Sequence, residues 1–402
     1  MRVLYLHQFF TTREGTGGTR SYEFARHLVH SGHEVTILTA ARGRPGRREV
    51  DGIDVHEVGG ASPDYVAATG RGYASRIAGF AGFSARAAAR GVRGPQADVV
   101  FATSPPLTIG LAGIAAARRW RVPFVFEVRD LWPEAPIQMG ALRSHGAQRA
   151  ARALERVTYR AAAHVVALSP GMRDGVIAAG VRPDQVTLIP NASDLELFSP
   201  DVDPGDLRVR LGLENAFVAS YFGTMGEAND LGQVVEAAAI LRSRDERSVA
   251  FVLQGDGKRR AGLAADVERR GLDNVHLLPA GDKHSAARLA AASDACMTIF
   301  KDVPILATNS PNKLFDTFAA GRAAIVNTDG WQRELVERNE AGVHARAGDP
   351  ADLAAQVLRL RDDPELTARM GANARHLAET EFDRRLLAER LRRLLESVAT
   401  DG

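Results

Sequence analysis

Short apolar runs rich in Val, Ile and Phe alternate with helical patterns along the chain. Several of these runs are apolar almost throughout, as expected for parallel strands that are covered on both faces. Strands that alternate with helices predict βαβ units and a parallel sheet. In the first half, strands are expected at residues 2–6, 34–39, 53–58, 98–102, 123–127, 164–168 and 186–189.

The second half repeats this pattern after two segments, 190–194 and 199–206, whose proline, glycine and aspartate content is typical of a linker. Residues 365–398 are almost continuously helical by pattern and have no strand to follow, so they are expected to pack across the outside. Strands are expected at 218–223, 249–254, 275–277, 295–300 and 323–327, and helices at 231–242, 311–320, 331–337 and 352–361.

A length of 402 residues suits two domains. The pattern predicts an α/β protein with two Rossmann-like domains whose parallel sheets face a central cleft. The expected boundaries are an N-terminal domain at 1–195, a C-terminal domain at 196–380, and a helix at 381–402 that packs back across the N-terminal domain.

Composition excludes several classes of protein. The chain is 45% hydrophobic and 25% charged, which is typical of a globular protein, and its net charge of +2 argues against a nucleic-acid binder. Cys296, the single cysteine, cannot form an intrachain disulfide. The first residues, MRVLYLHQFF, become polar too soon for a secretory signal, so a cytoplasmic protein is expected. The sequence contains no H-E-x-x-H, P-loop or G-x-S-x-G motif.

Ligands of open α/β sheets bind beyond the carboxyl ends of the strands, so the loops that follow strands are the places to search. Gly17 and Gly18 lie between the first strand and the first helix, where glycines allow close approach and helix amides favour an anion. The loop does not match G-x-G-x-x-G, and no acid follows the second strand, which weakens a dinucleotide site. The alternative is a plain flexible loop. Gly223 and Thr224 mirror it in the second half and should face it across the cleft.

Polar residues also cluster at the end of the strand at 123–127. Glu127, Arg129, Asp130, Trp132 and Glu134 combine acids, an arginine and a tryptophan, a set that can serve a polar substrate. The alternative is an ion-paired loop in which Trp132 fills the core.

The most specific signal is the helix start near Ser310. Serine is a favoured N-cap, Pro311 suits the first helical position, and Gly321 can close the C-terminus. The free amides and positive dipole end of such a helix suit a diphosphate.

Three polar side chains follow this helix start. Asn312, Lys313 and Asp316 are spaced so that all three can share one face, where Lys313 could meet the diphosphate and Asp316 could accept hydrogen bonds from ribose hydroxyls. The alternative is a capped helix with a local Lys–Asp pair.

Taken together, these segments resemble glycosyltransferase family 4, retaining enzymes of the GT-B fold, over nearly the whole chain. The segments at 129–133 and 310–313 resemble the bacterial polysaccharide branch that transfers N-acetylated amino sugars, such as N-acetyl-fucosaminyl transferases. The anchors of the family resemblance are the glycine loops at 17–18 and 223–226, and residues 189–191, 255–257, 293–294 and 311–321.

The resemblance implies that the C-terminal domain binds the nucleoside diphosphate sugar and the N-terminal domain binds the acceptor. The implied donor is a uridine diphosphate sugar, and the acceptor is a glycan, a lipid-linked intermediate or a small molecule. Transfer would retain the anomeric configuration and need no metal or other cofactor. Asp316 matches the acid that holds the ribose, while Glu127, Trp132 and Glu134 would lie on the acceptor side.

The chain departs from the family pattern in three places. Thr308 stands where the family has its first glutamate, residues 227–230 lack the usual basic residue, and Arg129 replaces a frequent histidine. These departures make Lys313 the main candidate cation for the diphosphate and Asp130 the preferred polar partner near the acceptor or sugar.

Three rival functions remain open. They are a GT-B-type nucleotide-sugar epimerase, an NAD-dependent oxidoreductase, and a non-catalytic two-lobed binding protein. Product analysis with donor alone separates the first from a transferase, and failure to bind NAD would dismiss the second.

The N-terminal domain also has basic stretches that could contact an anionic membrane. Residues 65–97 contain no acid, and Phe80 and Phe83 lie beside the arginines there. The alternative is an ordinary solvated helix face. The arginines concerned are Arg71, Arg76, Arg86, Arg90 and Arg93, followed by Arg149, Arg152, Arg156 and Arg160 in a second stretch that contains one acid, Glu155.

Overall fold

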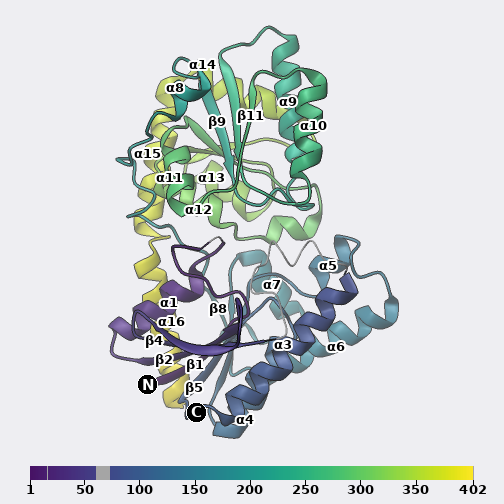
Figure 1. Ribbon diagram of the computed structural model, residues 1–402, viewed down its shortest axis with the longest axis vertical. Coiled ribbons are helices and arrows are strands. Elements are labelled where there is room, and N and C mark those ends of the chain that lie inside the picture. The colour runs from purple at the N-terminus through teal and green to yellow at the C-terminus, as the bar shows by residue number, and fades with distance from the viewer. Residues whose placement is uncertain (16, 60–72, 402) are drawn as a thin grey trace.

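Two α/β domains lie one above the other in the computed structural model, which describes residues 1–15, 17–59 and 73–401 (Figure 1). The N-terminal domain contains an eight-stranded sheet in the order β3-β4-β2-β1-β5-β6-β7-β8. Its strands are β1 (Arg2–Leu6), β2 (Glu34–Ala40), β3 (Gly46–Val50), β4 (Ile53–Val58), β5 (Val99–Thr103), β6 (Phe124–Val128), β7 (His164–Ala167) and β8 (Val186–Leu188).

All seven strands expected in this half are present, because nearly continuous apolar runs fit strands buried on both faces. The sequence missed β3, which pairs antiparallel with β4 at the edge of the sheet. Four of its five residues are exposed, so its polar sequence carries no burial signal. The helices are α1 (Arg20–His30), α3 (Tyr73–Arg93), α4 (Ile109–Trp120), α5 (Glu134–Gln138), α6 (His145–Ala161) and α7 (Pro170–Ala178), with a 3₁₀ turn, η1 (Pro183–Gln185).

The C-terminal domain contains a six-stranded parallel sheet in the order β11-β10-β9-β12-β13-β14. The strands are β9 (Phe217–Phe222), β10 (Val249–Gln254), β11 (Val275–Leu278), β12 (Ala295–Thr298), β13 (Ala323–Val326) and β14 (Gly342–His344). The helices are α8 (Leu207–Leu211), α9 (Leu231–Ser243), α10 (Arg260–Arg270), α11 (Lys283–Ala291), η2 (Pro304–Thr308), α12 (Asn312–Ala319), α13 (Trp331–Arg338) and α14 (Pro350–Asp362).

Two predictions for this sheet need correction. The expected strand at 295–300 ends at Thr298, because the Phe300 amide leaves the ladder and donates to Asn327 Oδ1 at 2.8 Å. Strand β14 was missed because three residues are too few to show a pattern.

The helical stretch predicted at 365–398 is two helices, α15 (Pro364–Thr380) and α16 (Arg384–Asp401). In Figure 1 they run from the C-terminal domain down along the N-terminal one. Leu387, Leu391 and Leu395 of α16 are buried in the same cluster as Val3 and Tyr5 of β1. The last helix is therefore part of the N-terminal core, while the boundaries at 195 and 380 stay predictions.

No helix in residues 1–15, 17–59 and 73–401 is both long and apolar enough to cross a membrane.

A buried ion pair ties three parts of the N-terminal domain together. Arg20, at the start of α1, donates to Glu127 at the end of β6 over 2.8 and 3.0 Å. The side chains are 4% and 0% exposed, respectively. Arg20 also donates to the carbonyls of Ile189, at 2.8 Å, and Pro190, just after β8. Because all these groups are removed from water, the loss of one partner would leave a buried charge unpaired.

We predict that Arg20→Gln lowers the free energy of unfolding by about 3–5 kcal/mol, the cost of breaking a buried ion pair from one side. Urea denaturation measures the change. The control is Arg47→Gln, which removes an exposed ion pair with Asp54 and should cost much less because solvent screens that pair. Equal losses in the two variants would contradict the structural importance of Arg20.

Candidate active site

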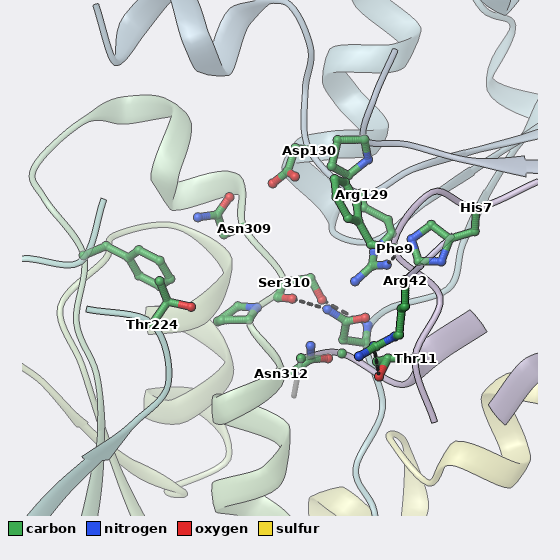
Figure 2. A pocket seen from close by; sticks show the side chains of 16 residues that line it. His7, Phe9, Thr11, Arg42, Arg129, Asp130, Thr224, Asn309, Ser310 and Asn312 are labelled. Atoms are coloured by element: carbon green, nitrogen blue, oxygen red, sulfur yellow. Dashed lines mark hydrogen bonds between the residues drawn. The ribbon is translucent and has the colours of Figure 1, made fainter. Parts of the chain in front are cut away.

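A pocket of about 340 Å³ lies between the two domains (Figure 2). Its N-terminal wall comes from the loops that follow β1, β2, β5 and β6, and its C-terminal wall comes from the loops after β9 and β12 and from the start of α12. These loops follow the carboxyl ends of the strands, the edge of the sheet that the sequence analysis singled out. The volume falls in the range of small-molecule sites.

The two glycine loops face each other across this pocket. Gly17, Gly18 and Thr224 all line it. Gly17 has a φ of +110°, which favours glycine, and a Cβ at Gly18 would lie 3.0 Å from Asn312 Nδ2 and 3.3 Å from Arg129 Nη2. Gly18 therefore fills the narrow space between a side chain of each domain.

Gly223 does not line the pocket but shapes the loop that does. Its φ is +133°, and a Cβ at Gly255 would lie 1.8 Å from its carbonyl oxygen. The glycines of the next loop thus allow it to pack directly against the backbone of the Gly223 loop.

The loop after β6 contributes Arg129 and Asp130 to the pocket. Arg129 Nη1 lies 3.3 Å from Nε2 of His7, whose Nδ1 lies 2.8 Å from Ser21 Oγ. Burial and the neighbouring Arg129 charge hold the pKa of His7 well below its usual value, so the imidazole is neutral. Burial raises the pKa of Asp130 to about 6, although the Arg129 charge acts to lower it. Asp130 is thus poised to change its charge near neutral pH.

Glu127, Trp132 and Glu134 do not line the pocket, and their assignment to the acceptor side stays a prediction. Glu127 is fully buried and accepts from Arg20 and from Thr103 Oγ1. Trp132 packs edge-on against Phe80, with ring centroids 6.3 Å apart. Glu134 pairs with Arg152 at 2.8 Å. The contacts of these three residues fit an ion-paired loop with a partly buried tryptophan, whereas Arg129 and Asp130 line the pocket.

Helix α12 begins at Asn312 with Pro311 in the N-cap position, so Ser310 is not the cap that the sequence predicted. Ser310 Oγ instead accepts from the backbone amide of Asn191 at 3.1 Å, and the Asn191 side-chain amide donates to the Ser310 carbonyl. Ser310, Pro311 and Asn312 all line the pocket. Gly321, with a φ of +63°, ends the helix as predicted.

Lys313 lies in the first turn of α12 but is not among the residues that line the pocket. Nζ donates to Tyr221 Oη at 2.5 Å, and that hydroxyl donates to the Thr224 carbonyl at 2.6 Å. Burial lowers the pKa of Lys313 to about 7. In this arrangement Lys313 supports the Gly223–Thr224 loop through Tyr221, and its contact with a diphosphate stays a prediction.

Asp316 is bound to a different lysine than the sequence suggested. It accepts from Lys283 Nζ at 2.8 Å and is 4% exposed, so the local Lys313–Asp316 pair does not form. Burial raises the pKa of Asp316, and Lys283 opposes that shift. Asn312 and Asp316 do share a face, because both line a second cavity of about 20 Å³, which has room for one water.

The sequence analysis missed several pocket residues, notably His7, Phe9 and Thr11 after β1 and Arg42 after β2. Arg42 is exposed and donates to Thr11 Oγ1 at 3.1 Å. Figure 2 shows these side chains on the wall opposite Thr224. Their position just after β1 and β2 is the signal that could have identified them, because ligands of open α/β sheets bind beyond the carboxyl ends of strands.

Across the part of the chain that the structure describes, no group of three or more His, Cys, Asp or Glu side chains is placed to hold a metal ion. Cys296 is buried, and this burial raises the pKa of its thiol to about 11.

Two family models match the chain. Residues 15–192 match the glycosyl transferase 4-like domain, and residues 216–363 match glycosyl transferases group 1. A D-inositol 3-phosphate glycosyltransferase of Thermomonospora curvata is 29% identical over 392 residues, which is 90% of this chain and 87% of that relative.

Two further similarities agree with these matches. An Escherichia coli (strain K12) glycosyl transferase named for colanic acid biosynthesis is 29% identical over 239 residues, 55% of this chain. The alignment spans 54% of that relative, about half of its length. The structure of Anabaena HepE in complex with UDP-glucose has the same fold, with a TM-score of 0.74 at 20% identity, over 99% of this chain and 100% of that one.

We predict that the carboxyl of Asp130 titrates with a pKa of about 6 and that Arg129→Gln moves the value higher, because the arginine charge opposes the effect of burial. Carbon NMR of protein labelled at the aspartate carboxyls measures the titration, and the Asp130→Asn spectrum identifies the resonance. A value near 4 in both proteins, the ordinary value of an aspartate, would show that the carboxyl is well solvated.

Proposed function

We propose that the chain, which has the GT-B fold, is a glycosyltransferase that moves a sugar from a uridine diphosphate donor to an acceptor held by its N-terminal domain. One observation carries the proposal: the start of α12 and two facing glycine loops border a single pocket between the domains. Backbone amides at a helix start attract an anion, and glycines let a diphosphate approach the chain.

The donor would lie along the C-terminal wall. The amides at Asn312 and the loop at Thr224 border the space for its phosphates. We retain Asp316 as the proposed partner of the ribose hydroxyls, although it pairs with Lys283 beside a cavity that has room for only one water. The HepE structure, whose fold this chain shares, contains UDP-glucose, which supports the choice of uridine diphosphate. The resemblance of residues 129–133 and 310–313 to the amino-sugar branch supports an N-acetylated hexosamine as the sugar.

The proposed reaction breaks the bond between the anomeric carbon and the phosphate oxygen and forms a bond from that carbon to an acceptor hydroxyl oxygen. The acceptor attacks from the face that the phosphate leaves, so the anomeric configuration is retained. The acceptor proton passes to the leaving phosphate, so no strong protein base is required. Arg129 and Asp130 lie on the N-terminal wall, where Asp130 would contact the sugar or the acceptor. Fixed groups of this kind stabilise charge that develops in the transition state without having to reorganise.

We predict that a screen of nucleoside diphosphate sugars finds a UDP-N-acetylhexosamine as the donor, with release of UDP undiminished by chelator. The physical reason is that amides and arginines of the protein can supply the positive charge that a metal supplies elsewhere. Release of UDP is measured with and without chelator, and product analysis with donor alone separates transfer from epimerisation. Loss of activity in chelator that manganese or magnesium restores would contradict the metal-free mechanism.

We further propose that the outer face of α3, α4 and α6 contacts an anionic membrane, which would suit a lipid-linked acceptor. Glu155, the single acid in these three helices, is buried. Large exposed apolar residues on the same helices are Ile77, Leu111 and Val157. Basic faces with apolar neighbours are typical of such contacts. The exposed arginines of α3 and α6 are Arg86, Arg93, Arg149, Arg156 and Arg160, and Arg90 is half-buried.

The structure alters part of the sequence argument for this face. Phe80 and Phe83 are buried in the domain, so they cannot be the apolar neighbours that enter a membrane. Arg152 is engaged with Glu134. Arg71 and the side chain of Arg76 lie outside the described residues.

We predict co-sedimentation with anionic liposomes at low salt, weaker binding at high salt, and little binding to neutral liposomes, because salt screens charges on a surface. Replacing Arg86, Arg90 and Arg93 with glutamine should reduce the bound fraction without changing UDP release, since these side chains are remote from the pocket. No preference for anionic lipid at low salt would identify the face as ordinary surface.

A further inference from the structure

The positive charge around the pocket comes from the N-terminal domain. Arg42 and Arg129 are the cations that line it within the part of the chain that the structure describes. Three lysines of the C-terminal domain are turned to other partners. Lys313 donates to Tyr221 Oη, Lys283 pairs with Asp316, and Lys301 lies 3.6 Å from Glu227. The C-terminal domain, whose α12 amides would face the donor, therefore contributes no side-chain cation to the pocket lining in the part of the chain that the structure describes.

Arg129 nevertheless reaches the start of α12. The position that a Cβ would take at Gly18 lies 3.3 Å from Arg129 Nη2 and 3.0 Å from Asn312 Nδ2. Both side chains therefore approach the same point from opposite domains, and a ligand at the amides of α12 lies within reach of the Arg129 guanidinium.

Neither arginine of the pocket has a carboxylate partner in the ranges that the structure describes. Arg129 contacts the neutral His7 through its guanidinium, and Arg42 donates to Thr11 Oγ1. Arg20, by contrast, is paired with Glu127 of β6, two residues before Arg129. Two guanidinium groups that form no salt bridge in the described pocket leave donors for an anionic group such as a phosphate, although the Asp130 carboxyl lies near Arg129.

Resting on the proposed function, we propose that the N-terminal domain neutralises the diphosphate of the donor, with Arg129 as the principal cation and Arg42 as the second. Arg129 takes over the role left open by residues 227–230, which carry acids and no basic residue. The diphosphate is then held between the amides of α12 on one side and a guanidinium of the other domain. The donor thereby bridges the cleft, and its charge is met only when both domains are in contact.

Binding of UDP and of uridine to the full chain separates the phosphate contribution from the nucleoside contribution. Arg129→Gln should weaken UDP about 10- to 100-fold, the range expected for a lost hydrogen bond to a charged group, and leave uridine unchanged. Arg42→Gln should weaken UDP by a smaller factor because that side chain is exposed. Arg129→Lys keeps a charge without the planar fork and should fall between the wild type and Arg129→Gln.

Arg44→Gln is the matched control, because Arg44 is also exposed, follows β2 and lies outside the pocket lining. It should bind UDP as the wild type does, and thermal unfolding confirms that every variant is folded. Unchanged UDP affinity in Arg129→Gln overturns the inference and leaves the proposed function standing. Equal losses for UDP and uridine also overturn it, because they indicate a collapsed pocket. A wild type that binds neither ligand contradicts the proposed function itself.

Discussion

Both walls of the pocket depend on the buried guanidinium of Arg20. It neutralises Glu127, which lies only two residues before Arg129, and it donates hydrogen bonds to the carbonyls of Ile189 and Pro190. The next residue, Asn191, makes the two hydrogen bonds that fix Ser310 just ahead of α12. One side chain at the start of α1 thus positions the loop after β6 and, through the linker, the helix start on the opposite domain.

The domains also meet through a short apolar segment of the C-terminal half. Phe300, Ile305 and Leu306 are buried in the core cluster of the N-terminal domain. The Ile305 amide donates to Gln138 Oε1 at 3.0 Å, and Ser169 Oγ donates to the carbonyl of Thr308. Thr308, which replaces the first acid of the family pattern, therefore contributes to the domain contact through its backbone. Together with the Asn191–Ser310 bonds, this segment closes the cleft on the side where Phe300 lines the pocket.

The fold was largely predictable because parallel strands buried on both faces produce apolar runs that need no knowledge of their neighbours. The polar strand β3 lacked that signal because it lies exposed at a sheet edge. Pocket positions were predictable where backbone chemistry decides, as at Gly17, Gly18 and Thr224. Pocket positions were not predictable where a long side chain can reach several different hydrogen-bond partners. The spacing of residues on α12 cannot reveal that Lys313 hydrogen-bonds to a tyrosine of β9, or that Asp316 pairs with a lysine of α11.

The orientation of Lys313 changes where the electrostatic field of the pocket originates. A lysine whose pKa is lowered to about 7 is only partly charged at neutral pH. The amine of Lys313 also donates a hydrogen bond to Tyr221, which supports the Thr224 loop. A guanidinium keeps its charge in every environment of this kind, since its pKa lies far above the range of burial effects. The N-terminal wall of the pocket therefore carries the permanent cations. The C-terminal wall carries neutral donors, which are the backbone amides at the start of α12 and in the loop after β9. A dianionic ligand is attracted most strongly where both walls act on it, which places the electrostatic optimum at the contact between the domains.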